Sequence, residues 1–326
     1  MKIKDIELGH GIMLAPMAGF TDSAMRKICH RYGAEYTVTE MVSAKAVVYG
    51  DKKTYKLARI TEDEGPCALQ IFGSEPEIMA EGARLLSEPI DGGCSPVAID
   101  VNMGCPVPKI FGNAEGSALM KNPDLIYKIV NALTRATNLP VTVKLRLGVD
   151  RMRLNAIECA LAAESGGASL IALHGRTRSE MYGGMADYEE IARVKEKINI
   201  PLVANGDVTD ATTAIRAFRE TGADGIMIGR GAIGNPFIFA EIKAALENRE
   251  YTPPSIEERA EAALSQLKMA ISEKGEEVAV RESRKQIALY FKSFRGSAAL
   301  RAEINRALTL SEVETALGKV VFENSI

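Results

Sequence analysis

The stretch PVTVKLRLGVDRMRLNAIECALAAESGGASLIALHG, residues 140–175, contains two mostly apolar runs separated by one amphipathic segment. The runs 140–148 and 168–175 do not alternate between apolar and polar residues, which is typical of parallel strands covered on both faces. The segment between them, 153–167, has helical spacing and ends in glycines, as helices often do. The stretch therefore predicts a strand–helix–strand unit of a parallel sheet.

The same alternation extends over most of the chain. Apolar runs occur at 11–16, 34–40, 67–73, 97–102, 140–148, 168–175, 200–207 and 223–230. Helical patterns lie between them, including 23–33 after the cap signal Thr21-Asp22, and 122–137 with Pro123 near its first turn. Eight such units in about 240 residues predict an α/β fold, a (β/α)8 TIM barrel. The alternative is a doubly wound open sheet.

The strand signals stop near residue 244. Helical patterns follow at 254–275, 282–296, 299–307 and 310–317, and they are entered through YTPPS at 251–255. We therefore predict a barrel domain at 1–243 and a small helical C-terminal domain at 244–326.

Composition excludes several classes of protein. The 326 residues are 46% hydrophobic, and 40 basic against 43 acidic residues leave a net charge of -3, which does not indicate a nucleic-acid binder as a whole. No apolar run is long enough to span a membrane and the N-terminus is too polar for a signal peptide, so a cytoplasmic protein without a membrane partner is expected. Five irregularly spaced cysteines, none in C-x-x-C, argue against a zinc site and a disulfide framework, and no metal is expected.

Polar or reactive residues follow nearly every apolar run. In a barrel the active site lies at the carboxyl ends of the strands, and the residues expected there are Pro16, Met17, Ala18, Gln70, Asn102, Cys105, Lys144, Arg146, His174, Arg176, Arg178, Asn205, Gly206, Asp207, Gly229 and Arg230. Taken singly, each of them can be explained as a loop residue that caps or turns the chain at a strand end. Together they predict a functional site at the mouth of the barrel.

The segment GRGAIGNP, 229–236, contains G-x-G-x-x-G. A Rossmann fingerprint would require a further strand ending in an acidic residue, but a helical pattern follows instead. The glycines then indicate either a tight turn or, with NGD at 205–207, a phosphate site after strands seven and eight. A phosphate there, a cation at Lys144 and an amide at Gln70 together suggest a flavin mononucleotide (FMN).

At these residues the sequence strongly resembles the tRNA-dihydrouridine synthase family, in particular its bacterial DusB-like branch. The resemblance is carried by APMAGFTD (15–22), TEMVSA (39–44), LQIFGS (69–74), DVNMGCPVPK (100–109), GSALM (116–120), VKLRLG (143–148), HGRTR (174–178), NGD (205–207) and GRGAIGNPF (229–237). It implies an FMN enzyme that uses NADPH, or NADH, to reduce the C5–C6 double bond of particular uridines in tRNA.

The resemblance also implies roles for individual residues. The residues expected to hold FMN are Pro16, Met17, Ala18, Gln70, Lys144, His174, Asn205, Gly206, Asp207, Gly229 and Arg230. Cys105 would be the catalytic residue, with Asn102 beside it near flavin and uracil. Arg176 and Arg178 suit a phosphate of cofactor or RNA, and we assign them to substrate binding.

Cys105 could be a packed core thiol, a metal ligand, a nucleophile or an acid. The cysteine spacing removes the metal and the disulfide. With a flavin that delivers hydride to C6 of uracil, the remaining need is a proton at C5. An unperturbed thiol, with a pKa of about 8.5, is mostly protonated at neutral pH, so we predict that Cys105 is the general acid.

The window 281–306 holds seven basic residues against two acidic ones. We predict that this excess contacts tRNA phosphates and assign Arg284 and Lys285 to substrate binding, while Tyr290, Phe291 and Phe294 are expected to be a buried stripe. Two positions depart from the family pattern, Ala114-Glu115-Gly116 in the loop after Cys105 and Gln286 in the tail. A monomer is expected.

Three other functions remain as alternatives. A dihydroorotate-dehydrogenase-like flavoenzyme would act on a small pyrimidine, a non-catalytic RNA-binding barrel would not need Cys105 or Lys144, and a phosphate-sugar aldolase would not explain NMGCP at 102–106. The sequence does not identify which uridine is reduced or whether NADPH is preferred over NADH.

Overall fold

The computed structural model describes residues 1–324. Eight parallel strands form its centre: β3 (Ile12–Leu14), β4 (Thr37–Val38), β6 (Cys67–Phe72), β7 (Ala98–Asn102), β8 (Val141–Arg146), β11 (Leu170–His174), β12 (Leu202–Asn205) and β13 (Gly225–Ile228). The sheet closes because Met13 bridges Tyr36 in parallel and the Leu14 amide donates to the Tyr36 carbonyl at 2.9 Å. The predicted TIM barrel is therefore confirmed, and each of the eight apolar runs contributes one strand.

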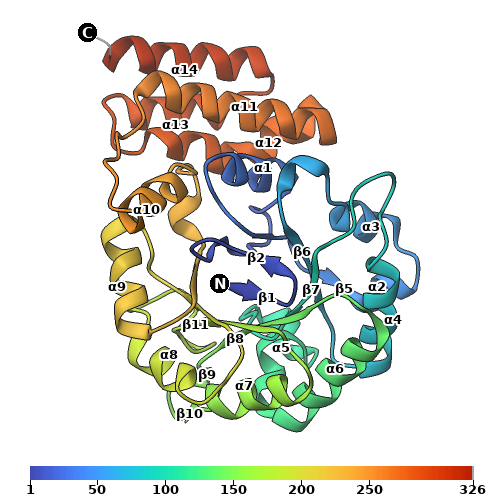
Figure 1. Cartoon of the computed structure of the whole chain (residues 1–326). Helices are drawn as coiled ribbons and strands as arrows, with labels where there is room; N and C mark the ends of the chain where they lie inside the picture. The colour runs from blue at the N-terminus through green and yellow to red at the C-terminus, as the bar shows by residue number, and fades with distance from the viewer. Residues whose placement is uncertain (325–326) are drawn as a thin grey trace.

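Helices surround the strands (Figure 1), including one in each of the predicted segments 23–33, 122–137 and 153–167. They are α1 (Ser23–Arg31), α2 (Ala44–Val48), α3 (Lys52–Ala58), α4 (Pro76–Leu86), α5 (Pro108–Gly112), α6 (Pro123–Ala136), α7 (Ala156–Ser165), α8 (Tyr188–Lys195), α9 (Ala211–Thr221) and α10 (Ile238–Leu246). Asp22 caps α1 by accepting from the Met25 amide at 3.0 Å, so the predicted cap signal is used. Helix α7 starts three residues later than its pattern suggested, because Arg153–Leu154 form β10, which pairs with β9 (Gly148–Asp150).

The N-terminal end of the barrel is filled by the start of the chain. A short antiparallel ribbon, β1 (Lys2–Ile3) with β2 (Ile6–Glu7), lies at the centre of the ring in Figure 1. Ile3 and Leu8 are buried there against inward side chains of the strands, including Met13, Tyr36 and Met227. Because this end is closed by apolar packing, only the opposite end of the barrel, where the strands finish, is open to a ligand.

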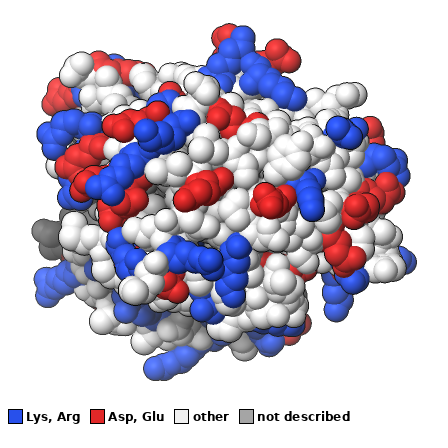
Figure 2. Space-filling model, turned by 90° about the horizontal axis from the view of Figure 1, so that it is seen from below, with Lys and Arg blue, Asp and Glu red and all other residues white. Residues whose placement is uncertain are grey.

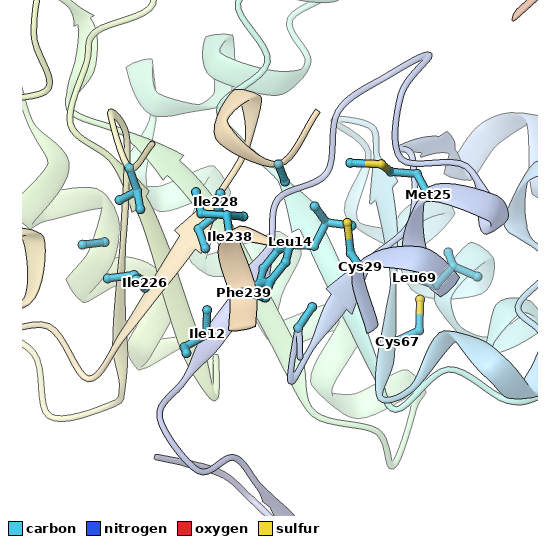
Figure 3. Packing of buried hydrophobic residues seen from close by; sticks show 14 of the residues in the cluster. Ile12, Leu14, Met25, Cys29, Cys67, Leu69, Ile226, Ile228, Ile238 and Phe239 are labelled. Atoms are coloured by element: carbon cyan, nitrogen blue, oxygen red, sulfur yellow. The ribbon is translucent and has the colours of Figure 1, made fainter. Parts of the chain in front are cut away.

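The main core lies between the strands and the helices. Figure 3 shows Ile12, Leu14, Ile226 and Ile228 from β3 and β13 close to Phe239 of α10. Cys29 and Cys67 belong to the same apolar layer, and burial raises the pKa of Cys67 to about 11. All five cysteines are free thiols. Those in this layer act as small apolar side chains.

A second group of helices packs on one side of the barrel, next to α1 (Figure 1). It consists of α11 (Ile256–Lys274), α12 (Glu276–Ile287), the 3-10 turn η4 (Ala288–Phe291), α13 (Ser297–Ile304) and α14 (Leu310–Asn324). We call it the helical part. The expected boundary at 243/244 falls inside α10, which packs on α9 of the barrel, so the connecting segment is 247–255. Tyr290 and Phe291 are buried, as expected, whereas Phe294 is only half-buried.

No helix in the described chain is long and apolar enough to cross a membrane. Within residues 1–324, no group of three or more His, Cys, Asp or Glu side chains is placed to hold a metal ion.

Candidate active site at the barrel mouth

A cleft of about 990 Å³ lies at the carboxyl ends of the strands, between the barrel and the helical part. It brings together the predicted catalytic Cys105, Asn102, Arg176 and every residue that was predicted to hold a cofactor. These come from seven of the eight strand ends. The parallel arrangement explains the convergence, since all strands finish at the same rim.

Cys105 is held in the cleft through its backbone. The side-chain oxygen of Asn102 accepts hydrogen bonds from the amides of Cys105 (2.9 Å) and Gly104 (3.3 Å), and the Ser117 hydroxyl donates to the Cys105 carbonyl at 2.7 Å. Burial raises the thiol pKa, against weaker opposite effects of the Val107 amide and Arg146. The thiol is therefore protonated at neutral pH and can donate a proton.

A chain of buried polar side chains runs beneath the cleft. Thr142 and Gln70 donate to the Asp100 carboxylate at 2.5 and 2.7 Å, and Asn102 donates to the Gln70 carbonyl oxygen at 2.9 Å. Burial raises the pKa of Asp100, although these two hydrogen bonds and Lys144 act in the opposite direction. The chain fixes the amide planes of Gln70 and Asn102, so both present a defined donor and acceptor pattern to the cleft.

Lys144 is a buried amine in the wall of the cleft. Its side chain is 8% exposed, and in the part of the chain that the structure describes its Nζ has neither a hydrogen bond nor a carboxylate within 4.0 Å. Burial, assisted by the positive charge of Arg146, lowers its pKa to about 7. This amine is therefore available to an electron-rich group of a ligand.

His174 lies in the same electropositive surroundings. Burial, together with Lys144, Arg146 and Arg176, lowers the His174 pKa well below its ordinary value. The Arg176 guanidinium lies 3.3 Å from His174 Nε2. Because a guanidinium only donates, Nε2 is the acceptor and the ring proton lies on Nδ1. His174 is therefore a neutral side chain with one donor.

The far end of the cleft is built from the loops after β12 and β13. Gly206 has φ +128°, and a Cβ atom on it would lie 2.7 Å from the Ala186 Cβ, so this turn requires glycine. Asp207 accepts from Arg176 Nη2 and the Ala186 amide, each at 2.7 Å. Burial acts against ionisation of Asp207, but these hydrogen bonds lower its pKa overall.

The two arginines near Asp207 differ in how tightly their side chains are held. Arg176 is 1% exposed and is also bound to the carbonyls of Gly183 and Gly184, so its guanidinium clamps this loop. The Arg230 guanidinium is 57% exposed and lies 3.8 Å from Asp207. Arg230 is the cation that can turn toward an anionic ligand.

Three predicted substrate residues lie outside the cleft lining. Arg178 stacks on the Phe111 ring, with 4.1 Å between its Cζ and the ring centroid. Arg284 donates through Nε to the Ala307 carbonyl at 3.2 Å, which is a structural contact within the helical part. Lys285 is exposed, and its Nζ lies 4.6 Å from the centroid of Phe20, a residue of the cleft wall.

Several lining residues were not predicted. Arg146 is not one of these, because it was expected at the barrel mouth, although without a role. It donates to the carbonyls of Gly104 and Thr177 at 2.9 and 2.8 Å, and burial lowers its pKa to about 10. Its position in an apolar strand was the available signal. The helical part contributes a whole wall that no local motif indicated: Arg259, Leu289, Tyr290, Lys292, Ser293 and Phe294.

Comparison with solved structures gives the fold. The chain aligns with a 2-naphthoyl-CoA reductase (TM-score 0.55, 13% identity, 76% of this chain and 52% of that one). It aligns similarly with a histamine dehydrogenase from Rhizobium sp. 4-9 (TM-score 0.55, 14% identity, 80% and 49%). It thus spans about half of these longer proteins.

Comparison with known sequences gives the family. The family model described as dihydrouridine synthase (Dus) matches residues 13–325. A probable tRNA-dihydrouridine synthase of Rickettsia conorii is 40% identical over 307 residues, 94% of this chain and 91% of the relative. The tRNA-dihydrouridine synthase B of Pseudomonas aeruginosa is 38% identical over 311 residues, 94% and 91%. The chain therefore belongs to the dihydrouridine synthase family.

Proposed function

We propose that this protein is a flavin-dependent tRNA-dihydrouridine synthase, which reduces the C5–C6 double bond of particular uridines in tRNA and takes its reducing equivalents from NADPH or NADH. The observation that carries the proposal is the meeting of an unpaired buried Lys144 and a protonated Cys105 thiol in one cleft. Family membership and the names of the relatives support it. A tRNA substrate implies a cytoplasmic enzyme.

The residues of the cleft fit FMN. Lys144 needs an electron-rich partner, the fixed amides of Gln70 and Asn102 match the edge of a pyrimidine ring, and the exposed Arg230 beside a glycine turn suits a phosphate. The residues that would hold FMN are Pro16, Met17, Ala18, Gln70, Lys144, His174, Asn205, Gly206, Asp207, Gly229 and Arg230. When bound, FMN supplies the hydride that goes to C6 of uracil.

The protein supplies the second half of the reduction. Hydride addition at C6 leaves negative charge on C5 and the adjacent carbonyl, and that charge is quenched by a proton at C5. Cys105 carries such a proton at neutral pH, and Asn102 with Ser117 fixes its backbone within the cleft. Lys144 places a cation in the same cleft, where it can stabilise negative charge during the reaction.

The charge of the cleft suits a polyanion. Its described lining contains the cations Lys144, Arg146, Arg176, Arg230, Arg259 and Lys292 but a single carboxylate, Asp207. The whole chain, by contrast, carries a net charge of -3, and on the face seen in Figure 2 basic and acidic residues are interspersed. The target uridine has to leave its stack to enter a barrel mouth, and we assign the adjacent contacts with tRNA to the predicted C-terminal domain, residues 244–326.

The test uses the purified full-length protein and a tRNA made by transcription, which carries no modified bases. The protein should be yellow, be bleached anaerobically by NADPH or NADH, and be reoxidised by tRNA with formation of dihydrouridine, detected by nucleoside mass spectrometry. Omitting the reductant is the control. Colourless protein that cannot take up FMN would refute the flavin, and reduction of orotate without reduction of tRNA would favour the small-pyrimidine alternative.

A further inference from the structure

The helical part contacts the barrel at, among other places, the segment that follows the predicted cofactor residues Pro16–Ala18. Gln286 of α12 donates to the Phe20 carbonyl at 3.2 Å, and Lys274 of α11 donates to Asp22 at 2.6 Å. Further contacts on α1 are the Lys27–Glu273 ion pair at 3.0 Å and the Ser23–Glu273 hydrogen bond at 2.7 Å. The neighbourhood of α1, α11 and α12 is visible in Figure 1.

Gln286 is held by a buried relay of polar side chains. Its carbonyl oxygen accepts from Gln266 at 2.7 Å, and the Gln266 carbonyl oxygen accepts from the Tyr290 hydroxyl at 2.7 Å. The three side chains are between 1% and 4% exposed. Because each buried amide must satisfy both its donor and its acceptor, the relay leaves Gln286 one orientation, with its nitrogen aimed at the Phe20 carbonyl.

The recipient of this hydrogen bond is a closed turn, Met17–Thr21. The Phe20 amide donates to the Met17 carbonyl at 2.9 Å, and the Met17 amide donates to the Thr21 hydroxyl at 2.9 Å. The Phe20 side chain lines the cleft, and the Lys285 ammonium lies over its ring. Internal bonds shape the turn, and two outside contacts hold it: Gln286 of α12 at the Phe20 carbonyl, and the Glu40 carboxylate, which accepts from the Gly19 amide.

We propose that Gln286 is a positioning residue for the flavin site: by holding the Met17–Thr21 turn, it places Pro16, Met17 and Ala18 against the cofactor. The helical part then determines flavin affinity as well as contact with RNA. This inference rests on the proposed function in that the turn borders the flavin. It also explains why a buried glutamine occupies this position of a helix whose neighbours Arg284 and Lys285 are charged.

The test is the Gln286→Met variant of the full-length protein, which keeps the side-chain length and removes the amide. It leaves the Phe20 carbonyl and the Gln266 amide without their partner, and we expect the Kd for FMN to rise about tenfold. Hydrogen exchange of the segment 15–22 should be faster in the flavin-free variant than in the flavin-free wild type. Affinity is measured by flavin fluorescence well below the melting temperature.

The matched control is Leu317→Ala. Leu317 is 1% exposed in α14, which packs on α11 and α13, so its truncation destabilises the helical part without touching the turn. It should lower the melting temperature and leave both the Kd for FMN and the exchange of 15–22 unchanged.

Two outcomes would overturn the inference. One is hydrogen exchange of segment 15–22 that is as slow in Gln286→Met as in the wild type. The other is a loss of FMN affinity in Leu317→Ala as large as that in Gln286→Met, which would mean that destabilising the helical part anywhere has the same effect. A wild-type protein that binds no FMN would instead refute the flavin in the proposed function. In that case the exchange of 15–22 still decides whether Gln286 holds the turn.

Discussion

Replacing Lys144 by methionine should remove a pH dependence of stability from the flavin-free protein. Burial lowers the Lys144 pKa from 10.5 to about 7 in the folded state, whereas the unfolded chain keeps the ordinary value. Between these two values the unfolded state binds more protons than the folded one, so the free energy of unfolding rises with pH. Methionine fills the same space and does not titrate.

The magnitude follows from the two pKa values. From about pH 7 to about pH 9, the folded lysine loses its remaining half proton while the unfolded one stays almost fully protonated, which adds about 2 kcal/mol to the free energy of unfolding. At pH 7 the Lys144→Met variant should be the more stable protein, because wild type either buries an unpaired charge or gives up a proton to fold.

The assay is urea unfolding of both flavin-free proteins at pH 7, 8 and 9. Other titrating groups are common to the two proteins, so the difference between them isolates Lys144, and it should move by about 2 kcal/mol in favour of wild type as the pH rises. Lys268→Met, which removes a half-exposed lysine of α11, should keep the wild-type slope. A difference that is independent of pH, or a variant less stable at pH 7, would refute the reasoning about Lys144.

Four further predictions concern the cleft and its rim. Cys105→Ala should keep flavin and lose tRNA reduction at least about 100-fold by nucleoside mass spectrometry; full activity would exclude Cys105 as the acid. Because burial raises the Cys105 pKa above its ordinary value, reoxidation by tRNA of the Lys144→Met variant, in which Lys144 no longer titrates, should keep its rate through neutral pH and slow only in the alkaline range; a fall between pH 7 and 8 in stopped-flow traces of this variant would contradict this. Asp207→Asn leaves the guanidinium of Arg176 buried without a carboxylate and should lower the free energy of urea unfolding by about 3 kcal/mol, whereas a loss below about 1 kcal/mol would mean that the pair is dispensable. Lys285→Ala and Lys292→Ala should each weaken tRNA binding and reduce its logarithmic salt slope by about one; an unchanged slope across a salt series would remove that lysine from the RNA interface.

The local pattern of apolar residues was enough to predict the barrel, because each strand is buried on both faces and each helix on one. The apolar runs therefore mark the strands directly, as the eight strands from β3 to β13 demonstrate. Local pattern failed at Arg153–Leu154, where a hairpin takes the residues that seemed to start α7. The predicted domain boundary at 243/244 lies within α10, Ile238–Leu246.

The candidate site was predictable as far as it depends on strand ends. Parallel strands finish on one rim, so Gln70, Asn102, Lys144, His174 and Asn205 had to converge once the strands were known. Asp100 was visible only as one acidic residue in an apolar run, and its role emerges when Gln70 and Thr142 are seen to donate to it. The basic composition of the C-terminal helices suggested that Arg284 contacts tRNA, but it did not reveal that Arg284 donates to a backbone carbonyl within the helical part.

What the sequence by itself determined is the scaffold and the chemistry. Eight apolar runs specify the barrel, and their order places a thiol, Cys105, and an amine, Lys144, at its rim, because position along a strand follows from the pattern. The tertiary structure decided how these groups are tuned. The pKa of Lys144 near 7, the proton retained by Cys105 and the hold of Gln286 on the Met17–Thr21 turn depend on burial and on contacts between segments far apart in the chain. Desolvation and long-range hydrogen bonds exist only once the chain has folded.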